Sequence, residues 1–461
     1  MILALLTLTA LGAAPHGHKA HRASPRQSSR DSLTSGYSSV SPHWPHIRTM
    51  MTDFYYKWTP AERAWAGRHY DLAMSGDLKA WRAQNPTVQH YKYVLLQAAI
   101  LPKTSGKGDL QSAWLPDMSR WYAAHPQFTI ESAFLHQAGQ PADSAHRLKP
   151  WGWATPTWII NPEDAGLIAY TTDRFQRAAE SEDGLFVDSQ GSGDIAKNSK
   201  GSSEYPVPSK YPPELTGYFT PYAKLLATLK GALGAKTLML NTGPYRFAPD
   251  SAFLAAAGAT HMEKTNNPIS SDLPATWVWI DKLLASGVFV DFVDAHDAAD
   301  MPGVVKRGYA TSVEDAFRRM KFAELASYYM VVPRAPDRLA LQLVNMWDRP
   351  YPPLWLKAQE ANIGHPTAVR RLVSAGVVAN DPVGQPVKVY TRDFDRALVI
   401  FRAQSGWGKQ IYGDATGVSF ALPGGEKWLP LAPDGSLGDA VTSVSLRNGD
   451  AAIVVKASTI S

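Results

Sequence analysis

The chain contains no cysteine among its 461 residues. This absence excludes disulfide bonds, zinc sites built on thiolates and a cysteine nucleophile. Charge is also sparse, at 19% of residues and a formal net charge of +5, and basic residues beyond the N-terminal tail are scattered. Because a nucleic-acid surface needs basic residues gathered together, we expect no nucleic-acid partner. With 45% hydrophobic residues, the length suits one large domain and one small one.

Two catalytic motifs are missing as well. No Gly-x-Ser-x-Gly sequence occurs, so an esterase of the α/β-hydrolase type would lack its nucleophile turn. No His-Glu-x-x-His sequence is present to hold zinc on a helix. The stretch Asp294-Ala-His296-Asp297 offers an alternative metal site, but acid-rich loops with a single His more often hydrogen-bond internally. We therefore expect neither a metal nor a cofactor.

The N-terminus has a composition of its own. The apolar run from Met1 to Ala14 ends in small residues, which is typical of a signal peptide, and it is too short to span a bilayer. Residues 15–44 are rich in His, Ser, Arg and Pro, which predicts a disordered linker. These features predict a bacterial protein exported to the periplasm or beyond, with no membrane span in its mature chain. A hydrophobic N-terminal strand is the alternative.

Short apolar strands alternate with helical stretches from about residue 45, which is typical of parallel βα units. Eight such units match a (β/α)8 TIM barrel over residues 45–380. A doubly wound sheet is the alternative, and Gly191-x-Gly193-x-x-Ala196 would then bind a dinucleotide. The polar residues that follow this motif do not form the helix that such binding requires. The predicted strands are 46–52, 70–75, 90–96, 184–188, 237–241, 259–263, 287–292 and 339–346.

The pattern changes beyond about residue 380. Residues 387–401 resemble a hairpin, residues 441–455 hold two more alternating strands, and helical periodicity is absent. This predicts a small antiparallel β-sandwich over residues 381–461. Within the barrel, the long stretches 114–158 and 189–213 follow the third and fourth strands. Loops after strands lie on the catalytic face of a TIM barrel, so we expect both to shape a cleft.

Two acidic residues close predicted barrel strands. Hydrolysis of a glycosidic bond without metal uses two carboxyl groups that flank the bond. Asp188 ends the strand 184–188, and Glu263 ends the strand 259–263. A carboxylate at the end of a buried strand is costly to desolvate unless it has partners or a task. We predict Asp188 as nucleophile or base and Glu263 as general acid; a helix cap and a salt bridge with Lys264 are the respective alternatives. Weaker candidates for the proton donor are Asp53 and the strand-seven group Asp291, Asp294 and Asp297.

Further residues near strand ends are predicted to bind substrate. Polar groups there can hydrogen-bond sugar hydroxyls, and aromatic rings can stack on a sugar ring. The chain is rich in such rings, with 15 Trp, 19 Tyr and 15 Phe. Packing in the core or at the surface is an equally good explanation for each residue. The predicted substrate-binding set is Arg48, Asp53, Asp71, Lys92, Asn241, Tyr245, Asp291, Asp294 and Trp347.

Several segments, taken in order, resemble a known family. They are Asp183-Gly-Leu-Phe-Val-Asp188 with its preceding helix, Met262-Glu263, Ile363-Gly-His-Pro366, the stretch 390–399 and Pro433-Asp-Gly435. Together they are similar to the hypothetical glycoside-hydrolase-like family fifteen, a TIM-barrel family related to the α-galactosidase and α-glucosidase superfamily. The resemblance implies a sugar-cleaving barrel with a C-terminal β-sandwich, Asp188 as nucleophile and a later acid as proton donor. Relatives often have Asn where this chain has Ser189, a departure that bears on substrate specificity.

These patterns lead to one principal expectation, a glycoside hydrolase acting on O-glycosidic bonds of an oligo- or polysaccharide. The alternative is a non-catalytic protein, glycan-binding or cell-wall-associated, on a degenerate barrel. The two differ in whether two acids face each other across a cleft.

Overall fold

The computed structural model describes most of the chain from residue 47 onward. The predicted signal peptide and linker lie outside the described residues, as do Asp53, Tyr245, Glu263, Asp294 and Trp347. The described ranges are 47–51, 59–96, 98–100, 115–149, 157–188, 208–211, 217–242, 254–262, 273–293, 301–306, 308, 310–335, 337–343, 355–377, 386–403, 417–447 and 449–460.

Eight strands form a closed barrel in the order β1-β10-β9-β8-β7-β6-β3-β2. All eight predicted strands are confirmed, and closure excludes the doubly wound alternative, whose sheet is open. The barrel strands are β1 (Ile47–Met51), β2 (Leu72–Met74), β3 (Gln89–Leu95), β6 (Gly184–Asp188), β7 (Thr237–Asn241), β8 (Gly258–Met262), β9 (Phe289–Val293) and β10 (Leu339–Gln342).

Helices separate these strands, and local chemistry sets where they begin. Thr59 starts the first helix with a capping box, in which its side chain and that of Glu62 satisfy each other's backbone amides. Asp164 caps α5 by accepting from the amide of Leu167. The helices are α2 (Pro60–His69), α3 (Leu78–Gln84), α4 (Leu115–Ala124), α5 (Ala165–Ala179), α7 (Phe219–Leu233), α9 (Leu273–Ala285), α10 (Met301–Lys306) and α11 (Val313–Val331).

The described chain divides into two compact units. The first runs from His90 to Thr260, and the second combines the residues up to Gln89 with those from His261 onward. Nearly all of β3, together with β6 and β7, belongs to the first unit. The second unit contains β1, β2, β9, β10 and the C-terminal sheets.

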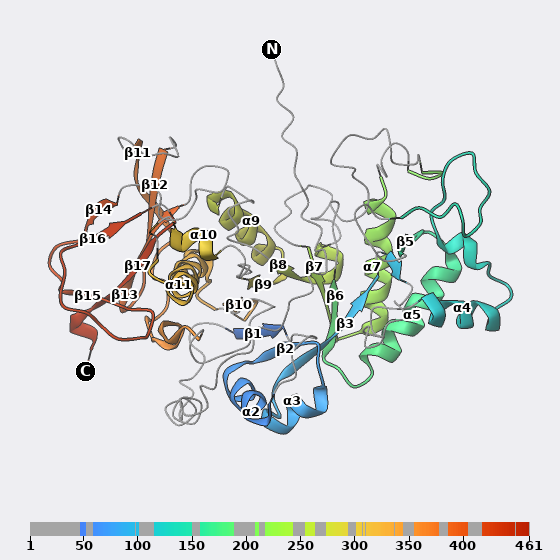
Figure 1. Ribbon diagram of the computed structural model, residues 1–461, viewed down its shortest axis with the longest axis horizontal. Helices are drawn as coiled ribbons and strands as arrows, with labels where there is room; N and C mark the ends of the chain where they lie inside the picture. The colour runs from blue at the N-terminus through green and yellow to red at the C-terminus, as the bar shows by residue number, and fades with distance from the viewer. Residues whose placement is uncertain are drawn as a thin grey trace, which may run out of the picture. The chain divides into compact units, whose positions relative to one another are not determined.

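In the first unit, β3, β6 and β7 are neighbouring parallel strands. Helix α5 contacts β6 and α7 contacts β7, and Figure 1 shows both helices beside these strands. Helices cover the outer face of a TIM barrel, and side chains alternate between the two faces of a strand. Leu185 and Val187 on β6 and Leu238 and Leu240 on β7, which alternate with Asp188 and Asn241 along their strands, are apolar and fully buried.

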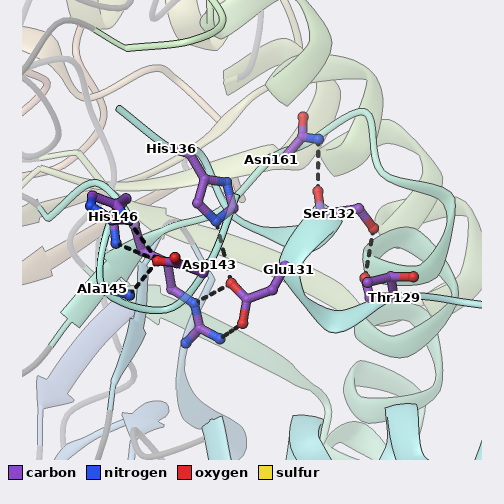
Figure 2. A network of polar contacts seen from close by, with 9 residues as sticks. Thr129, Glu131, Ser132, His136, Asp143, Ala145, His146 and Asn161 are labelled. Atoms are coloured by element: carbon purple, nitrogen blue, oxygen red, sulfur yellow. Dashed lines mark hydrogen bonds and ion pairs between the residues drawn. The ribbon is translucent and has the colours of Figure 1, made fainter. Parts of the chain in front are cut away.

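The long stretch after β3 forms a small insertion. Its strands β4 (Ala98–Ile100) and β5 (Thr157–Ile159) pair antiparallel, and helix α4 and the short 3-10 helix η1 (Ile130–Ala133) lie between them in sequence. A largely buried ion pair stabilises the insertion: Arg147 donates two hydrogen bonds to the carboxylate of Glu131. Figure 2 shows that His136 approaches the same carboxylate, with 3.3 Å between His136 Nε2 and Glu131 Oε2.

The second long stretch, which leaves β6, returns to this insertion. The amide of Ser209 donates to the carbonyl oxygen of His136 at 2.8 Å. The hydroxyl of Tyr211 donates to Glu163 Oε2 at 2.6 Å, while Tyr211 itself has a φ of 60° in the left-handed region. Such a backbone is unfavourable for a tyrosine unless its surroundings hold it. The two long loops predicted from the sequence are therefore joined.

The second unit ends in two antiparallel sheets, which confirms the predicted β-sandwich. The predicted hairpin is β12 with β13, but the sheet already starts at Arg371, before the expected boundary at residue 381. Apolar side chains from both sheets, among them Ile400, Trp428 and Phe420, form a shared core. One sheet has the order β11-β12-β13-β17-β15 and the other pairs β14 with β16. Their bounds are β11 (Arg371–Val377), β12 (Pro386–Asp393), β13 (Ala397–Ala403), β14 (Val418–Ala421), β15 (Trp428–Pro430), β16 (Ser443–Leu446) and β17 (Ala451–Lys456).

Candidate active site

Asp188 is the last residue of β6, so it lies at the carboxyl end of a barrel strand. Its side chain is half-buried, whereas the four residues before it in the strand are buried. Two side chains from the flanking strands donate hydrogen bonds to its carboxylate. The hydroxyl of Tyr93 on β3 lies 2.5 Å from Oδ2, and Nδ2 of Asn241 on β7 lies 2.7 Å from Oδ1.

Strand register explains why these three side chains meet. Asp188 lies opposite Leu95, so Tyr93, two residues earlier on β3, points to the same face of the sheet. Asn241 ends β7 at the same level, since Val187 lies opposite Leu240. The three side chains therefore lie on one face of the sheet formed by β3, β6 and β7. We name Tyr93, Asp188 and Asn241 the β6 carboxylate site.

Two of these three residues, Asp188 and Asn241, were predicted from the sequence as site residues, and Tyr93 was not. Asp188 lies where a catalytic carboxylate was predicted. Asn241, predicted to contact substrate, is buried and donates a hydrogen bond to Asp188; its contact with substrate stays a prediction. Sequence analysis did not single out Tyr93, which lies inside its strand and not at its end. The pairing of β3 with β6 would have been needed to find Tyr93, because this pairing places its phenol ring near the carboxyl end of β6.

A second polar cluster lies inside the second unit. Asp291 on β9 accepts a hydrogen bond from Thr49 Oγ1 on β1 at 2.6 Å, and His261 Nδ1 on β8 lies 2.6 Å from its other oxygen. Gln342 on β10 approaches the same threonine at 3.5 Å. Asp291 and His261 have no exposed surface. Both side chains are therefore part of the buried interior of the second unit, and the predicted substrate contact of Asp291 stays a prediction.

Arg48 and Asp71 lie at the amino ends of their strands. The amide of Arg48 donates to Asp71 Oδ2 at 3.0 Å, and the amide of Asp71 donates to the carbonyl oxygen of Arg48 at 2.9 Å. Arg48 is buried with its guanidinium 5.3 Å from the ring of Trp355. Burial lowers the pKa of Arg48, although the charges of Glu360 and Asp71 oppose this effect. Catalytic groups of a TIM barrel lie at the other edge, so this position indicates a structural role.

Lys92 is also separated from the β6 carboxylate site. It precedes Tyr93 on β3 and therefore points to the opposite face of that strand, where it is half-buried. Within the ranges that the structure describes, no three or more His, Asp and Glu side chains gather as metal ligands would. Of the predicted residues that are described, Asp188 and Asn241 come together in the first unit, and Arg48 and Asp71 come together in the second.

The β6 carboxylate site has the features that acetal chemistry needs from one of its two acids. The carboxylate belongs to a rigid strand, is partly open to solvent, and is oriented by donors on both of its oxygens. Groups oriented by neighbouring hydrogen bonds react from a fixed geometry. Such a carboxylate can attack a carbon centre or accept a proton from water.

No family model and no curated protein matches the chain. Similar solved structures include a β-L-arabinopyranosidase from Geobacillus stearothermophilus, with 11% identity, a TM-score of 0.47 and coverage of 90% of this chain and 98% of that one. An α-galactosidase from the same organism has 11% identity, a TM-score of 0.43 and coverage of 89% and 55%. An α-amylase from Geobacillus thermoleovorans has 9% identity, a TM-score of 0.39 and coverage of 90% and 87%.

All three similar proteins are glycoside hydrolases by description. Identities near one in ten and TM-scores below 0.5 do not decide what this chain does. Its own strand order establishes the closed barrel, and its own side chains define the site at the end of β6.

Proposed function

We propose that the chain is a glycoside hydrolase that cleaves O-glycosidic bonds in an oligo- or polysaccharide. The observation that carries this proposal is the carboxylate of Asp188, held at the carboxyl end of a barrel strand between Tyr93 and Asn241. A barrel fold supports many chemistries, so the site and not the fold has to carry the argument. Strand-end carboxylates of barrels are where acid, base and nucleophile functions occur.

Asp188 acts in this proposal as nucleophile or base, and Glu263 acts as general acid. Glu263 directly follows β8 in the sequence and lies outside the described residues. In a retaining reaction, a carboxylate oxygen of Asp188 bonds to the anomeric carbon while the acid gives its proton to the departing oxygen. Water then cleaves the resulting ester. In an inverting reaction, Asp188 instead takes a proton from the attacking water.

The distance between the two carboxyl groups distinguishes these routes. Retaining enzymes have a separation of about 5–5.5 Å, and inverting enzymes one of about 6.5–9.5 Å, because a water must fit between the general base and the sugar. The anomeric configuration of the first product, followed by NMR, therefore reports which of the two roles Asp188 performs.

A glycan screen with matched variants tests the proposed function. We expect the purified full chain to release sugar from at least one glycan, and Asp188→Asn and Glu263→Gln each to lower that rate by at least about 100-fold. Binding of the glycan should persist, since Asn and Gln keep the size of the acids. Asp173→Asn is the control, because this exposed carboxylate on α5 pairs with Arg177 away from β6.

Two outcomes would contradict the proposal. Wild-type rates in both Asp188→Asn and Glu263→Gln would remove the assigned carboxylates from the reaction. Glycan binding without sugar release from any member of the panel would instead support the non-catalytic, glycan-binding alternative.

A further inference from the structure

We propose that Tyr93 is a positioning residue for Asp188, whose hydroxyl holds carboxylate oxygen Oδ2 while Asn241 holds Oδ1. This inference rests on the proposed function of Asp188, and it assigns a role to a residue that no sequence pattern marked. The two donors come from the two strands that flank β6, so they approach the carboxylate from opposite sides.

The distance between Tyr93 and Asp188 indicates a strong hydrogen bond. At 2.5 Å between the phenol oxygen and Oδ2, it has the length of a charge-assisted O–H···O⁻ bond. A carboxylate can only accept here, so the phenol must donate. The hydroxyl proton therefore points at one defined oxygen of Asp188.

Packing aims the Tyr93 ring independently of this bond. The ring lies opposite Phe186 across the β3–β6 pair, with ring centroids 5.8 Å apart and planes tilted by 46°. Phe186 and Asp188 lie two residues apart on β6 and share a face. The strand that carries the carboxylate thus also supports the ring of its donor.

The consequence is that the plane of the Asp188 carboxylate is fixed. A donor on each oxygen opposes rotation of the carboxylate about its last side-chain bond, and loss of the Tyr93 hydroxyl removes one of these two donors. Loss of the Tyr93 hydroxyl should therefore slow the chemical step without weakening substrate binding.

The chain offers a matched control on the same strand. Tyr91 lies two residues before Tyr93, on the same face of β3, and its hydroxyl donates to Thr237 Oγ1 at 3.2 Å. Tyr91→Phe and Tyr93→Phe therefore delete the same group from neighbouring positions, and only the second deletion reaches Asp188. We expect Tyr93→Phe to lower kcat by about 10-fold to 100-fold with KM within about twofold, and Tyr91→Phe to leave both within about twofold.

Crystal structures of the two variants complete the test. A lower kcat and a turned Asp188 carboxylate in Tyr93→Phe alone would support the inference. Equal kcat and an unmoved carboxylate in both variants would overturn it. The crystal comparison does not depend on hydrolysis. A wild-type chain that releases no sugar therefore contradicts the proposed function, while the carboxylate in Tyr93→Phe still decides the role of Tyr93.

Discussion

At the scale of single residues, the β6 carboxylate site joins three strands through one acid. Tyr93 donates through a phenol and Asn241 through an amide. An aspartate has nearly the same size and shape as this amide side chain. Asn241→Asp would place a second carboxylate at the position from which Nδ2 now donates at 2.7 Å. Two carboxylates that share a site cannot both be ionised without repulsion.

The first prediction concerns the pH dependence of this exchange. In Asn241→Asp, a shared proton can replace the lost hydrogen bond at low pH, but at high pH the two charges repel. We expect sugar release relative to wild type to fall steadily as the pH rises. Asn241→Ala should show a deficit that varies little with pH, and a pH-independent ratio in both variants would contradict the expectation.

The second prediction concerns Arg48, which the sequence assigned to substrate binding. Within the described ranges, its Nε and Nη1 atoms make no hydrogen bond, and burial lowers the pKa of its guanidinium. Exchange of a buried charge for an apolar side chain of similar length is often neutral or stabilising. We expect Arg48→Met to change the free energy of unfolding by less than about 1 kcal/mol, since the lost contact with Trp355 offsets the gain.

Sugar release should be unchanged in Arg48→Met, because Arg48 lies at the amino end of β1. Urea titration and the glycan assay measure the two effects separately. A large rise in the KM of Arg48→Met would indicate that Arg48 binds substrate and would contradict the structural role.

At the scale of elements, the insertion after β3 depends on the contact between Glu131 and Arg147. Burial alone would raise the pKa of the Glu131 carboxyl, but the hydrogen bonds and charges of Arg147 and His136 outweigh it and hold the pKa below its ordinary value. A carboxyl with a lowered pKa in the folded state stabilises the fold above its unfolded pKa. That contribution is lost as the pH falls through the folded value.

The third prediction follows from the lowered pKa of Glu131. Glu131→Gln should lower the free energy of unfolding by about 1–3 kcal/mol at neutral pH, because Arg147 loses a charged partner. The difference from wild type should shrink as the pH falls below about 4.3, the ordinary pKa of glutamate. Asp143→Asn is the control; this exposed carboxyl in the same insertion pairs with His146, as Figure 2 shows, and its loss should leave the unfolding midpoint unchanged. A constant difference at all pH values would contradict the assignment.

The sequence predicted which strands exist better than where each strand ends. Errors in the strand ends explain why some predicted site residues do not lie at strand ends. Eight strands and the sandwich follow from local alternation of apolar residues, and Asp188 follows from its place after such a run. Strand β2 begins at Leu72 and β9 continues to Val293. Asp71 therefore precedes its strand, and Asp291 lies inside one. Tyr93 could not be predicted, because its task depends on which residue of β6 lies opposite it.

At the scale of the whole molecule, Trp277 links α9 to the C-terminal sandwich within the second unit. Its fully buried ring meets Tyr390 of β12 and Phe401 of β13 edge to face, at centroid distances of 5.2 and 5.5 Å. Its indole nitrogen donates to Ser327 Oγ on α11 at 2.9 Å. The sandwich therefore completes the core around these two helices.

Among the described helices, none is long and apolar enough to cross a membrane.

The fourth prediction tests this link. Trp277→Ala should lower the free energy of unfolding by about 3–5 kcal/mol, through lost burial and the cavity that remains. Val278→Ala, at the neighbouring exposed position, should change it by less than about 0.5 kcal/mol. Denaturant titrations give both values, and independent unfolding of the sandwich at an unchanged midpoint in Trp277→Ala would contradict a shared core.

The junction between the two long loops has a consequence for how this protein changes in evolution. Ser209 attaches the chain that leaves Asp188 to the insertion that leaves β3, and Tyr211 attaches it to Glu163, which follows that insertion. A loop pinned to its neighbour does not vary alone, because a new length or shape on one side breaks the contacts of the other. Divergence in substrate preference should therefore proceed by paired replacement of both segments, and relatives that lose the acid at Glu163 should also lose the tyrosine at Tyr211.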